Sequence, residues 1–254
     1  MIYINSSKNE QIKKIKKLRQ EECFYWWEGF KFFNEILKEK KTIYQLVLTE
    51  KNYNVLKDEI NNIHVEKIYL VTDEVFKKIS FTVTPQGIGG ILKKKTYKLS
   101  EICSEKKPIF FLDGLQDPGN VGTIVRVADA FNFAGIIYRN NGVSPYHEKA
   151  VRSSVGSILR VPCYCIDDKE LHKFIKTNRP LFFLEPNSDD SYNIKQVDRE
   201  ELRWGVFFLG KEGSGLEIKI AGAKKIYIPM KNSVDSLNVA ITAGIVGFLV
   251  GELY

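Results

Sequence analysis

The sequence contains few residues that bind metals and no long apolar segment. Its four cysteines include no C-x-x-C pair, and its three histidines are too few for a metal-ligand cluster. The N-terminus lacks the apolar core of a signal peptide. The candidate membrane segment, residues 239–253, is shorter than the roughly 20 apolar residues that span a bilayer. We therefore expect a reduced, cytoplasmic protein with no metal and no membrane segment.

Size and charge suggest two parts with different tasks. The chain has 254 residues, of which 44% are hydrophobic and 12% aromatic, enough for packed cores in one large domain or two ordinary ones. The formal charge of +7 is uneven, because residues 1–95 hold 18 Lys and Arg against 12 Asp and Glu, whereas residues 96–254 hold 20 against 19. A basic front half suits recruitment of a polyanion, although solubility alone explains the charge equally well.

The front half alternates predicted helices and strands. Ser7 to Glu10 has the form of a capping box, after which Ile12, Ile15 and Leu18 recur at helical spacing among lysines. This pattern predicts a basic amphipathic helix. Further strands are expected over residues 24–28, 44–48 and 67–71, and further helices from residue 30 and over residues 73–79.

The rear half has the pattern of a buried parallel sheet. Apolar runs predict strands over residues 108–112, 134–139, 181–184, 205–209 and 226–230. After the first strand, Asp117 is the expected N-cap and Pro118 the first helical residue, so that Asn120 lies at the carboxyl end of a strand. Open α/β sheets place their sites there. Arg126 lies in an apolar turn of the same helix and needs an anionic partner or a route to solvent.

Two further segments have the residue types of a binding site. Residues 210–215 have glycine spacing G-x-x-G-x-G between a strand and a predicted short helix, which lets backbone N–H groups approach a cofactor. The spacing differs from the dinucleotide fingerprint, so we reject a nucleotide-dependent oxidoreductase. Ser236 and Asn238 stand where the last helix begins, and their side chains either cap the helix or face a ligand.

Three segments, in order, carry a family resemblance. Asn120-Val-Gly-Thr-Ile-Val-Arg126, Gly210-Lys-Glu212-Gly-Ser-Gly215 and Ser236-Leu-Asn238-Val-Ala resemble the signatures of the SpoU/TrmH family, which are SPOUT-class RNA ribose 2'-O-methyltransferases. The resemblance implies an α/β fold with a trefoil-knotted methyltransferase domain at residues 107–254, a linker at residues 96–106 and a smaller N-terminal α/β RNA-binding domain at residues 1–95.

The resemblance also implies an activity. A methyl group passes from S-adenosylmethionine to a ribose 2'-hydroxyl of structured RNA, and the front domain favours large-subunit ribosomal RNA. Transfer RNA is one alternative, and a non-catalytic RNA-binding or ribosome-assembly protein on the same fold is another. The implied catalytic residues are Arg126, Asn120, Glu212, Ser236 and Asn238, and the implied cofactor contacts are Gly210, Ile228, Leu237, Leu209 and Met230.

The resemblance finally implies a homodimer through the C-terminal domain, in which the arginine of one subunit serves the cofactor site of the other. Arg126 is the leading catalytic candidate. Because an arginine stays protonated at neutral pH, we prefer for Arg126 the binding of an RNA phosphate and the stabilisation of developing alkoxide charge over the role of a base.

Overall fold

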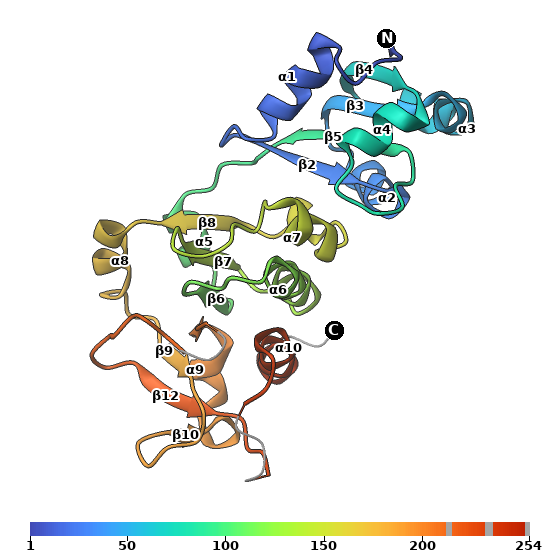
Figure 1. Cartoon of the computed structure of the whole chain (residues 1–254). Coiled ribbons are helices and arrows are strands. Elements are labelled where there is room, and N and C mark those ends of the chain that lie inside the picture. Colours follow the sequence, from blue (N-terminus) through green and yellow to red (C-terminus); the bar gives the residue numbers. More distant parts are fainter. Residues whose placement is uncertain (212–214, 232–235, 252–254) are drawn as a thin grey trace. The chain divides into compact units, whose positions relative to one another are not determined.

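The chain is divided by its internal contacts into two α/β units (Figure 1). The computed structural model describes residues 1–211, 215–231 and 236–251. The first unit comprises Met1–Lys95 with Tyr146–Leu159, and the second comprises Thr96–Pro145 with Arg160–Tyr254. Within the described residues, no helix is long and apolar enough to cross a membrane.

The first unit is built on a five-stranded mixed sheet of order β1-β4-β3-β5-β2. Strands β1, β4 and β3 are parallel, and β5 runs antiparallel to both β3 and β2. Its elements are β1 (Ile2–Ile4), α1 (Glu10–Leu18), β2 (Phe24–Glu28), α2 (Phe30–Lys38), β3 (Ile43–Thr49), α3 (Glu50–Asn61), β4 (Val65–Val71), α4 (Asp73–Ile79) and β5 (Ile88–Lys93), with α7 (Glu148–Ser153) and the 3-10 turn η1 (Ser157–Leu159). The predicted alternation is therefore confirmed.

Adjacent tryptophans of β2 show how this sheet is covered. Successive strand residues point to opposite faces. Trp26 shares an apolar cluster with Ile15 of α1 and Phe76 of α4, whereas Trp27 stacks on Phe32 of α2 with ring centroids 5.7 Å apart. Helices α1 and α4 thus share one face of the sheet.

The start of α1 differs from the prediction. Asn9 rather than Ser7 is the N-cap, and its side chain accepts a hydrogen bond from the Gln11 N–H at 2.8 Å. Asparagine and serine are equally good N-cap residues, so the capping-box pattern did not decide between Ser7 and Asn9. The helix begins at Glu10 in consequence.

The second unit is built on a seven-stranded sheet of order β10-β12-β9-β11-β6-β7-β8, in which every pair is parallel. Its elements are α5 (Leu99–Ser104), β6 (Ile109–Leu112), α6 (Pro118–Ala130), β7 (Gly135–Arg139), β8 (Cys163–Ile166), α8 (Asp168–Phe174), β9 (Leu181–Leu184), β10 (Tyr192–Asn193), the 3-10 turn η2 (Ile194–Gln196), α9 (Arg199–Arg203), β11 (Val206–Leu209), β12 (Lys224–Tyr227) and α10 (Val239–Val250). The predicted buried parallel sheet is confirmed.

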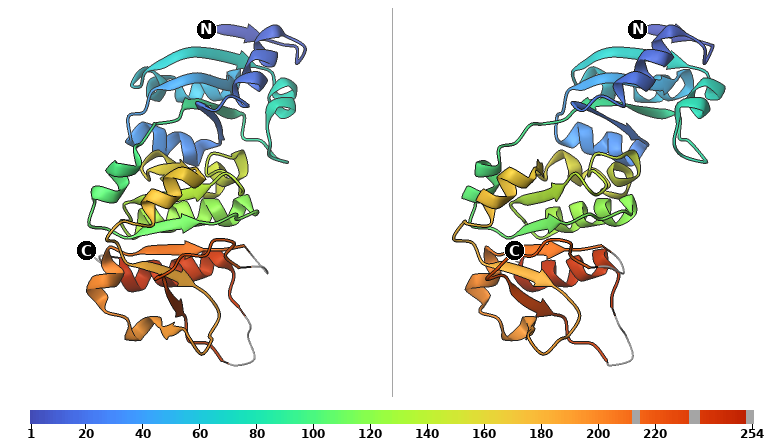
Figure 2. Two further views of the ribbon diagram at one scale, coloured as in Figure 1. Left: turned by 90° about the vertical axis from the view of Figure 1, so that its left-hand side faces the viewer. Right: turned by 60° about the vertical axis from the view of Figure 1, so that its left-hand side comes forward.

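Both faces of this sheet are packed with aromatic rings. On one face, Phe111 and Phe208 cluster with Phe174 of α8. On the other, the Phe110 ring lies 4.0 Å from that of Phe133, a residue that follows α6. Helix α10 packs against α6, as Figures 1 and 2 both show. The core thereby fixes α6 and α10 side by side.

Strand β12 is shifted from its predicted position. It covers Lys224–Tyr227 and pairs with β9 through the register Ile226 opposite Leu184. The strand begins with Lys224 and Lys225, which form ion pairs with Glu201 and Asp190. A prediction based on apolar runs could not include these two charged residues in the strand. Residues 228–230 consequently leave the strand and enter the loop at its carboxyl end.

Candidate functional site

The first part of the site is the N-terminus of α6. The Asp117 side chain accepts a hydrogen bond from the Gly119 N–H at 3.0 Å, and Pro118 is the first helical residue, as the sequence predicted. Pro lacks an N–H that would be unpaired at this position, and its ring fixes a helical φ. Asn120 is therefore held in the first turn, just beyond the carboxyl end of β6.

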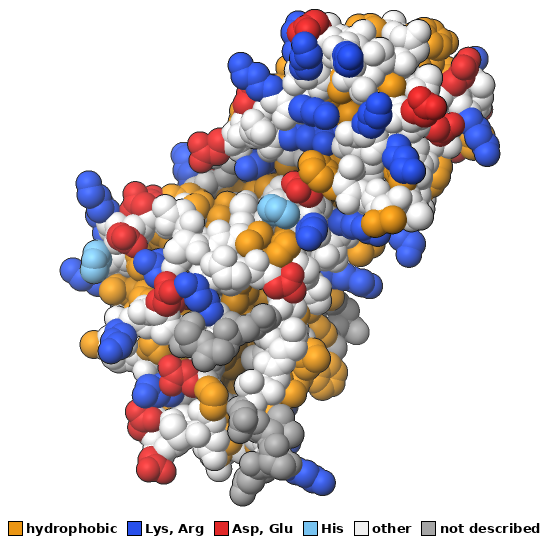
Figure 3. Space-filling view, viewed as in Figure 1, with side chains coloured by type: hydrophobic (Ala, Val, Ile, Leu, Met, Phe, Trp, Pro, Cys, Tyr) orange, Lys and Arg blue, Asp and Glu red, His pale blue; other side chains and the backbone are white. Residues whose placement is uncertain are grey.

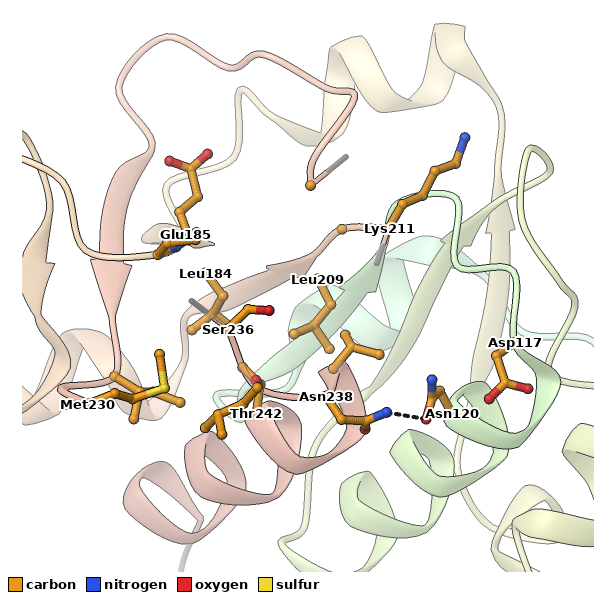
Figure 4. A pocket seen from close by; sticks show the side chains of 16 residues that line it. Asp117, Asn120, Leu184, Glu185, Leu209, Lys211, Met230, Ser236, Asn238 and Thr242 are labelled. Carbon is orange, nitrogen blue, oxygen red and sulfur yellow. Dashed lines mark hydrogen bonds between the residues drawn. The ribbon is translucent and has the colours of Figure 1, made fainter. Parts of the chain in front are cut away.

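The N-cap of α10 meets this turn. Asn238 Oδ1 accepts hydrogen bonds from the N–H groups of Ala240 and Ile241, at 2.9 and 3.3 Å. The Nδ2 group of the same side chain donates to Asn120 Oδ1 at 3.1 Å (Figure 4). The two roles considered from the sequence, capping and facing the site, are thus combined in one asparagine.

A cavity of about 660 Å³ lies between these helix ends and the strand ends, which is a volume typical of small-molecule sites. Eight of the ten residues predicted from the sequence line it: Asn120, Leu209, Gly210, Ile228, Met230, Ser236, Leu237 and Asn238. They come from segments separated by as many as 118 positions. The remaining lining residues are Asp117, Leu184, Glu185, Pro186, Lys211, Gly215, Val239 and Thr242.

Of the two other predicted residues, only Arg126 belongs to the described part of the chain. Arg126 lies on α6 with an exposed side chain, and it is absent from the set that surrounds the cavity. Of the two environments expected for this arginine, the structure shows a route to solvent. Glu212 lies outside the described residues.

Backbone packing beside the cavity explains the glycine at position 210. A Cβ atom built on Gly210 would lie only 2.4 Å from the carbonyl carbon of Gly215, so any side chain would separate the two segments. Lys211 and Gly215 form a two-way backbone pair, with N···O distances of 2.9 and 3.0 Å. The main chain rather than side chains therefore forms this wall of the cavity.

A buried carboxylate anchors the segment that follows. Asp113, at the carboxyl end of β6, is fully buried and accepts hydrogen bonds from the N–H groups of Glu217 and Ile218, at 2.7 and 2.9 Å. The short helix predicted after Gly215 is therefore wrong. The amides that would begin a helix are bound by this carboxylate, and residues 216–220 pass over the sheet without helical structure.

Charged neighbours complete this anchor. Arg139, at the end of β7, donates to Asp113 at 2.8 Å, and this hydrogen bond raises the pKa of the guanidinium. Glu217 accepts from Lys211 and from Asn141, the latter at 2.7 Å, and the bond from Lys211 lowers the pKa of Glu217. Lys211, a cavity residue, is thus tied to the segment that Asp113 holds.

Sequence reasoning missed one wall of the cavity, formed by Leu184, Glu185 and Pro186. Leu184 is the last residue of β9 and the other two follow it, and Figure 4 shows Glu185 on the side of the cavity across from Asn120. A signal was present, because β9 was predicted and its carboxyl end lies at the same edge as the other strand ends. Asp113 was also missed, although the same signal was present, because this residue directly follows the predicted strand β6.

The fold and the cavity define a class of protein. An all-parallel sheet with helices on both faces carries, at the carboxyl ends of its strands, a cavity lined by both apolar and polar side chains, and small-molecule and cofactor sites are commonly found at this position. The second unit is thus the cofactor-binding part of an α/β protein.

Comparisons with known proteins identify the family. The model of the SpoU rRNA Methylase family matches residues 107–248, and that of the MRM3-like substrate binding domain matches residues 9–90. Since the first match covers more than half of the chain, the protein belongs to the SpoU rRNA methylase family. The resemblance inferred from three short segments is confirmed.

Individual relatives cover nearly the whole chain. The 23S rRNA (guanosine(2553)-2'-O)-methyltransferase RlmP of Bacillus subtilis is 23% identical, with 96% of this chain and 97% of RlmP aligned. An uncharacterised tRNA/rRNA methyltransferase of Synechocystis is 29% identical over 95% of this chain and 90% of its own. The crystal structure of an AdoMet-bound rRNA methyltransferase from Sinorhizobium meliloti superposes with a TM-score of 0.81 at 25% identity, covering 98% and 96% of the two chains.

These comparisons confirm the predicted α/β SPOUT-type fold with an N-terminal substrate-binding domain. The trefoil knot expected from the resemblance stays a prediction, because residues 212–214 and 232–235 of this domain lie outside the described residues.

Proposed function

We propose that this protein transfers a methyl group from S-adenosylmethionine to a ribose 2'-hydroxyl of large-subunit ribosomal RNA. The observation that carries the proposal is the cavity in which eight predicted site residues meet at the carboxyl ends of β9, β11 and β12. Family membership and the named activity of the relative RlmP support it. In this proposal residues 1–95 recruit RNA, and residues 107–254 carry the reaction.

The residues present suit the cofactor. Leu184, Leu209 and Met230 offer apolar contacts for a purine, and the backbone at Gly210 is free of a side chain that would obstruct it. Bound S-adenosylmethionine supplies an electrophilic methyl group on a sulfonium. Ser236 and the paired Asn120 and Asn238 are placed to orient polar groups at the edge of the cavity.

The protein's task in this reaction is chiefly positioning. A ribose hydroxyl is a weak nucleophile, so its oxygen must be held in line with the bond that breaks. Asn238 serves this need because its amide is fixed at both ends, by the α10 backbone and by Asn120. We assign to Arg126 the binding of an RNA phosphate and the stabilisation of alkoxide charge as the O–C bond forms.

The exposure of Arg126 favours a dimeric site. Its side chain does not line the cavity of its own chain, which agrees with an arginine that acts on the cofactor site of a second copy. Helix α10 is apolar over most of its surface, yet Ile241 and Phe248 are 55% and 58% exposed. Helices that are apolar all round are normally buried, so a second subunit is a natural cover for this face.

The proposal is tested by calorimetric titration of the protein with S-adenosylmethionine and S-adenosylhomocysteine. Leu237→Arg places a charged side chain in the cavity and should weaken binding at least about 100-fold. Val55→Arg is the matched control, because Val55 is 70% exposed on α3, and it should bind normally.

The activity itself is measured by methyl incorporation into unmodified large-subunit ribosomal RNA, with transfer RNA as a second substrate. Cofactor-dependent ribose methylation of the ribosomal RNA alone is the expected result. Methylation of transfer RNA alone would replace the substrate assignment, and absence of both cofactor binding and methylation would overturn the proposal.

A further inference from the structure

An arginine of the first unit is packed between two aromatic side chains. The Arg19 guanidinium carbon lies 3.5 Å from the Trp26 ring centroid and 4.9 Å from that of Phe81. Its Nη1 donates to the Ile79 carbonyl at 2.6 Å, whereas Nε and Nη2 are buried without a hydrogen-bond partner. Burial lowers the pKa of Arg19 to about 10, so the group remains charged at neutral pH. The aromatic contacts thus stabilise the cation together with the charges of Glu28 and Glu148, which partly offset the effect of burial on its pKa.

The segment that carries Phe81 is held by one carboxylate. Glu28, the last residue of β2, accepts hydrogen bonds from the Phe81 N–H at 2.9 Å and from the Ser80 hydroxyl at 2.6 Å. It also accepts from the Trp26 indole N–H at 2.6 Å. Residues 80–82 are thereby fixed to the sheet although they lie outside regular secondary structure.

This fixed segment presents apolar side chains to solvent. Phe81 is 52% exposed and Val83 is 92% exposed. The Phe81 ring is supported on one side by Arg19 and is half-open to solvent. This segment therefore presents a fixed aromatic ring beside a second exposed apolar side chain.

Lysines lie on the two helices that end close to this segment. Helices α1 and α4 meet at their C-terminal ends through the bond from Arg19 to Ile79. The last turns of these helices carry exposed lysines, namely Lys16, Lys17, Lys77 and Lys78. None of the four forms an ion pair with a described residue. Figure 3 shows Lys and Arg side chains gathered over the region where Figure 1 draws α1 and α4.

We propose that Phe81, supported by Arg19, is a stacking platform for an unpaired RNA base, and that the four lysines bind the phosphates on either side. We name Phe81, Val83, Lys16, Lys17, Lys77 and Lys78 the platform surface. Single-stranded nucleic acids are bound in this manner, by aromatic rings that stack bases and cations that follow the backbone. The inference rests on the proposed RNA substrate and adds to it the position and the chemistry of the docking surface.

The charges favour RNA over a protein partner. A protein interface core is typically depleted of lysine, whereas four lysines on two helices that end close to an exposed aromatic ring match a polyanion with planar bases. Residues 80–86 add no acidic side chain, and the Glu28 carboxylate beside them is occupied by hydrogen bonds from Trp26, Ser80 and Phe81. The platform surface therefore combines both features that an unpaired RNA segment requires.

The aromatic part is tested with the full chain by fluorescence anisotropy, using a 12-nucleotide oligouridylate and unmodified large-subunit ribosomal RNA. Phe81→Ala should weaken binding of both probes about 10-fold, as expected for the loss of one stacked base. Phe81→Tyr should bind like the unchanged protein. Val55→Ala is the matched control, because it removes an exposed apolar side chain from α3 of the same unit.

The lysines are tested by the salt dependence of binding. Replacing all four by Ala should reduce the slope of log Kd against log salt by about three, at roughly 0.7 per phosphate contact. Phe81→Ala should leave this slope unchanged, because stacking releases no counterions. Lys51→Ala with Lys57→Ala, on α3, is the control for loss of charge and should change the slope by less than one.

The outcomes separate this inference from the proposed function. If the unchanged protein methylates ribosomal RNA while Phe81→Ala binds and methylates RNA equally well, the platform is wrong and the function stands. If Phe81→Ala instead weakens self-association and leaves RNA binding unchanged, the surface serves a second copy of this chain and the inference is overturned. If the unchanged protein binds neither cofactor nor RNA, the proposed function itself fails.

Discussion

The two units differ in both sheet and charge. The first has a mixed five-stranded sheet and carries the net positive charge, since residues 1–95 and 146–159 together hold 20 basic and 13 acidic side chains. The second has an all-parallel sheet, contains the cavity, and holds 18 basic and 18 acidic side chains over residues 96–145 and 160–254. Long-range attraction for RNA thus resides largely in the unit without the cavity.

The difference indicates that affinity and chemistry are separable in this protein. Phosphate contacts provide attraction that depends on salt, while a reaction depends on atoms placed within a few tenths of an ångström. Substitutions of cavity residues in the second unit should therefore alter turnover without altering the salt dependence of RNA binding. Substitutions of the four platform lysines should do the reverse.

The largest expected effect follows removal of Arg126. We expect Arg126→Ala to lower methyl transfer at least about 100-fold, the usual loss when a group that stabilises transition-state charge is removed. Cofactor affinity should stay within twofold, because the role assigned to Arg126 is the binding of an RNA phosphate and not of the cofactor. Single-turnover methylation of ribosomal RNA and calorimetry measure the two quantities.

Arg199→Ala provides the control for this test, because Arg199 is another exposed arginine of the second unit, on α9. It should keep full activity. Near-normal turnover of Arg126→Ala would show that the charge on this helix is not needed for the reaction. The inference that RNA affinity and reaction chemistry belong to different units would then lose its main support.

Asp113 should have the next largest effect. Asp113→Ala leaves the Glu217 and Ile218 amides and the Arg139 guanidinium without their buried acceptor, a change that typically costs about 3 kcal/mol. We expect a lower Tm and cofactor binding weakened about 10-fold, because the wall at Gly210 and Gly215 loses its anchor. Thermal unfolding and calorimetry provide the measurements.

A milder variant distinguishes anchoring from general instability. Asp113→Asn keeps the shape and removes the charge, so it should bind the cofactor weakly even below the temperature at which unfolding begins. Asp168→Asn alters the other, 80% exposed carboxylate that contacts Arg139, at 3.2 Å, and should change neither Tm nor binding measurably. Equal behaviour of the two variants would contradict a special role for Asp113.

Sequence patterns were sufficient for β6, β7, β9 and β11 of the second unit because these strands are buried on both faces, whereas the partly exposed β8 and the two-residue β10 were not predicted. Phe110 and Phe111 illustrate this, since both are fully buried and point in opposite directions. Strand β1 was missed because it has three residues and only Ile4 is buried. A short edge strand leaves too little apolar periodicity to detect.

The site was predictable in its residues but not in its contacts. Caps, prolines and glycines marked the ends of α6 and α10, so Asn120 and Asn238 could be placed at helix starts. Their mutual hydrogen bond joins positions far apart in the chain, and a single sequence gives no register between them. The same limitation hid Asp113, whose carboxylate binds amides 104 and 105 positions away. Long-range polar pairs of this kind are set by tertiary packing.

The smallest effect is expected at the ion pair of Lys211 and Glu217. Both side chains are partly exposed, and pairs of this kind contribute little in water. Glu217→Gln should therefore weaken cofactor binding by about threefold or less, far below the effect of Asp113→Ala. Lys219→Gln, a change in a neighbouring lysine, is the control and should have no effect.

The pH dependence of this pair has a definite sign. The bond from Lys211 holds the pKa of Glu217 below its usual value of 4.5, so the carboxylate stays charged in the folded protein at neutral and mildly acidic pH. Its stabilising contribution is present above the usual pKa and is lost only as the pH falls through the lowered pKa. The ratio of cofactor affinities between the unchanged protein and Glu217→Gln should thus be constant from pH 8 to about pH 5. A ratio that changes near pH 7 would show that another titrating group, and not this carboxylate, holds Lys211 at the wall of the cavity.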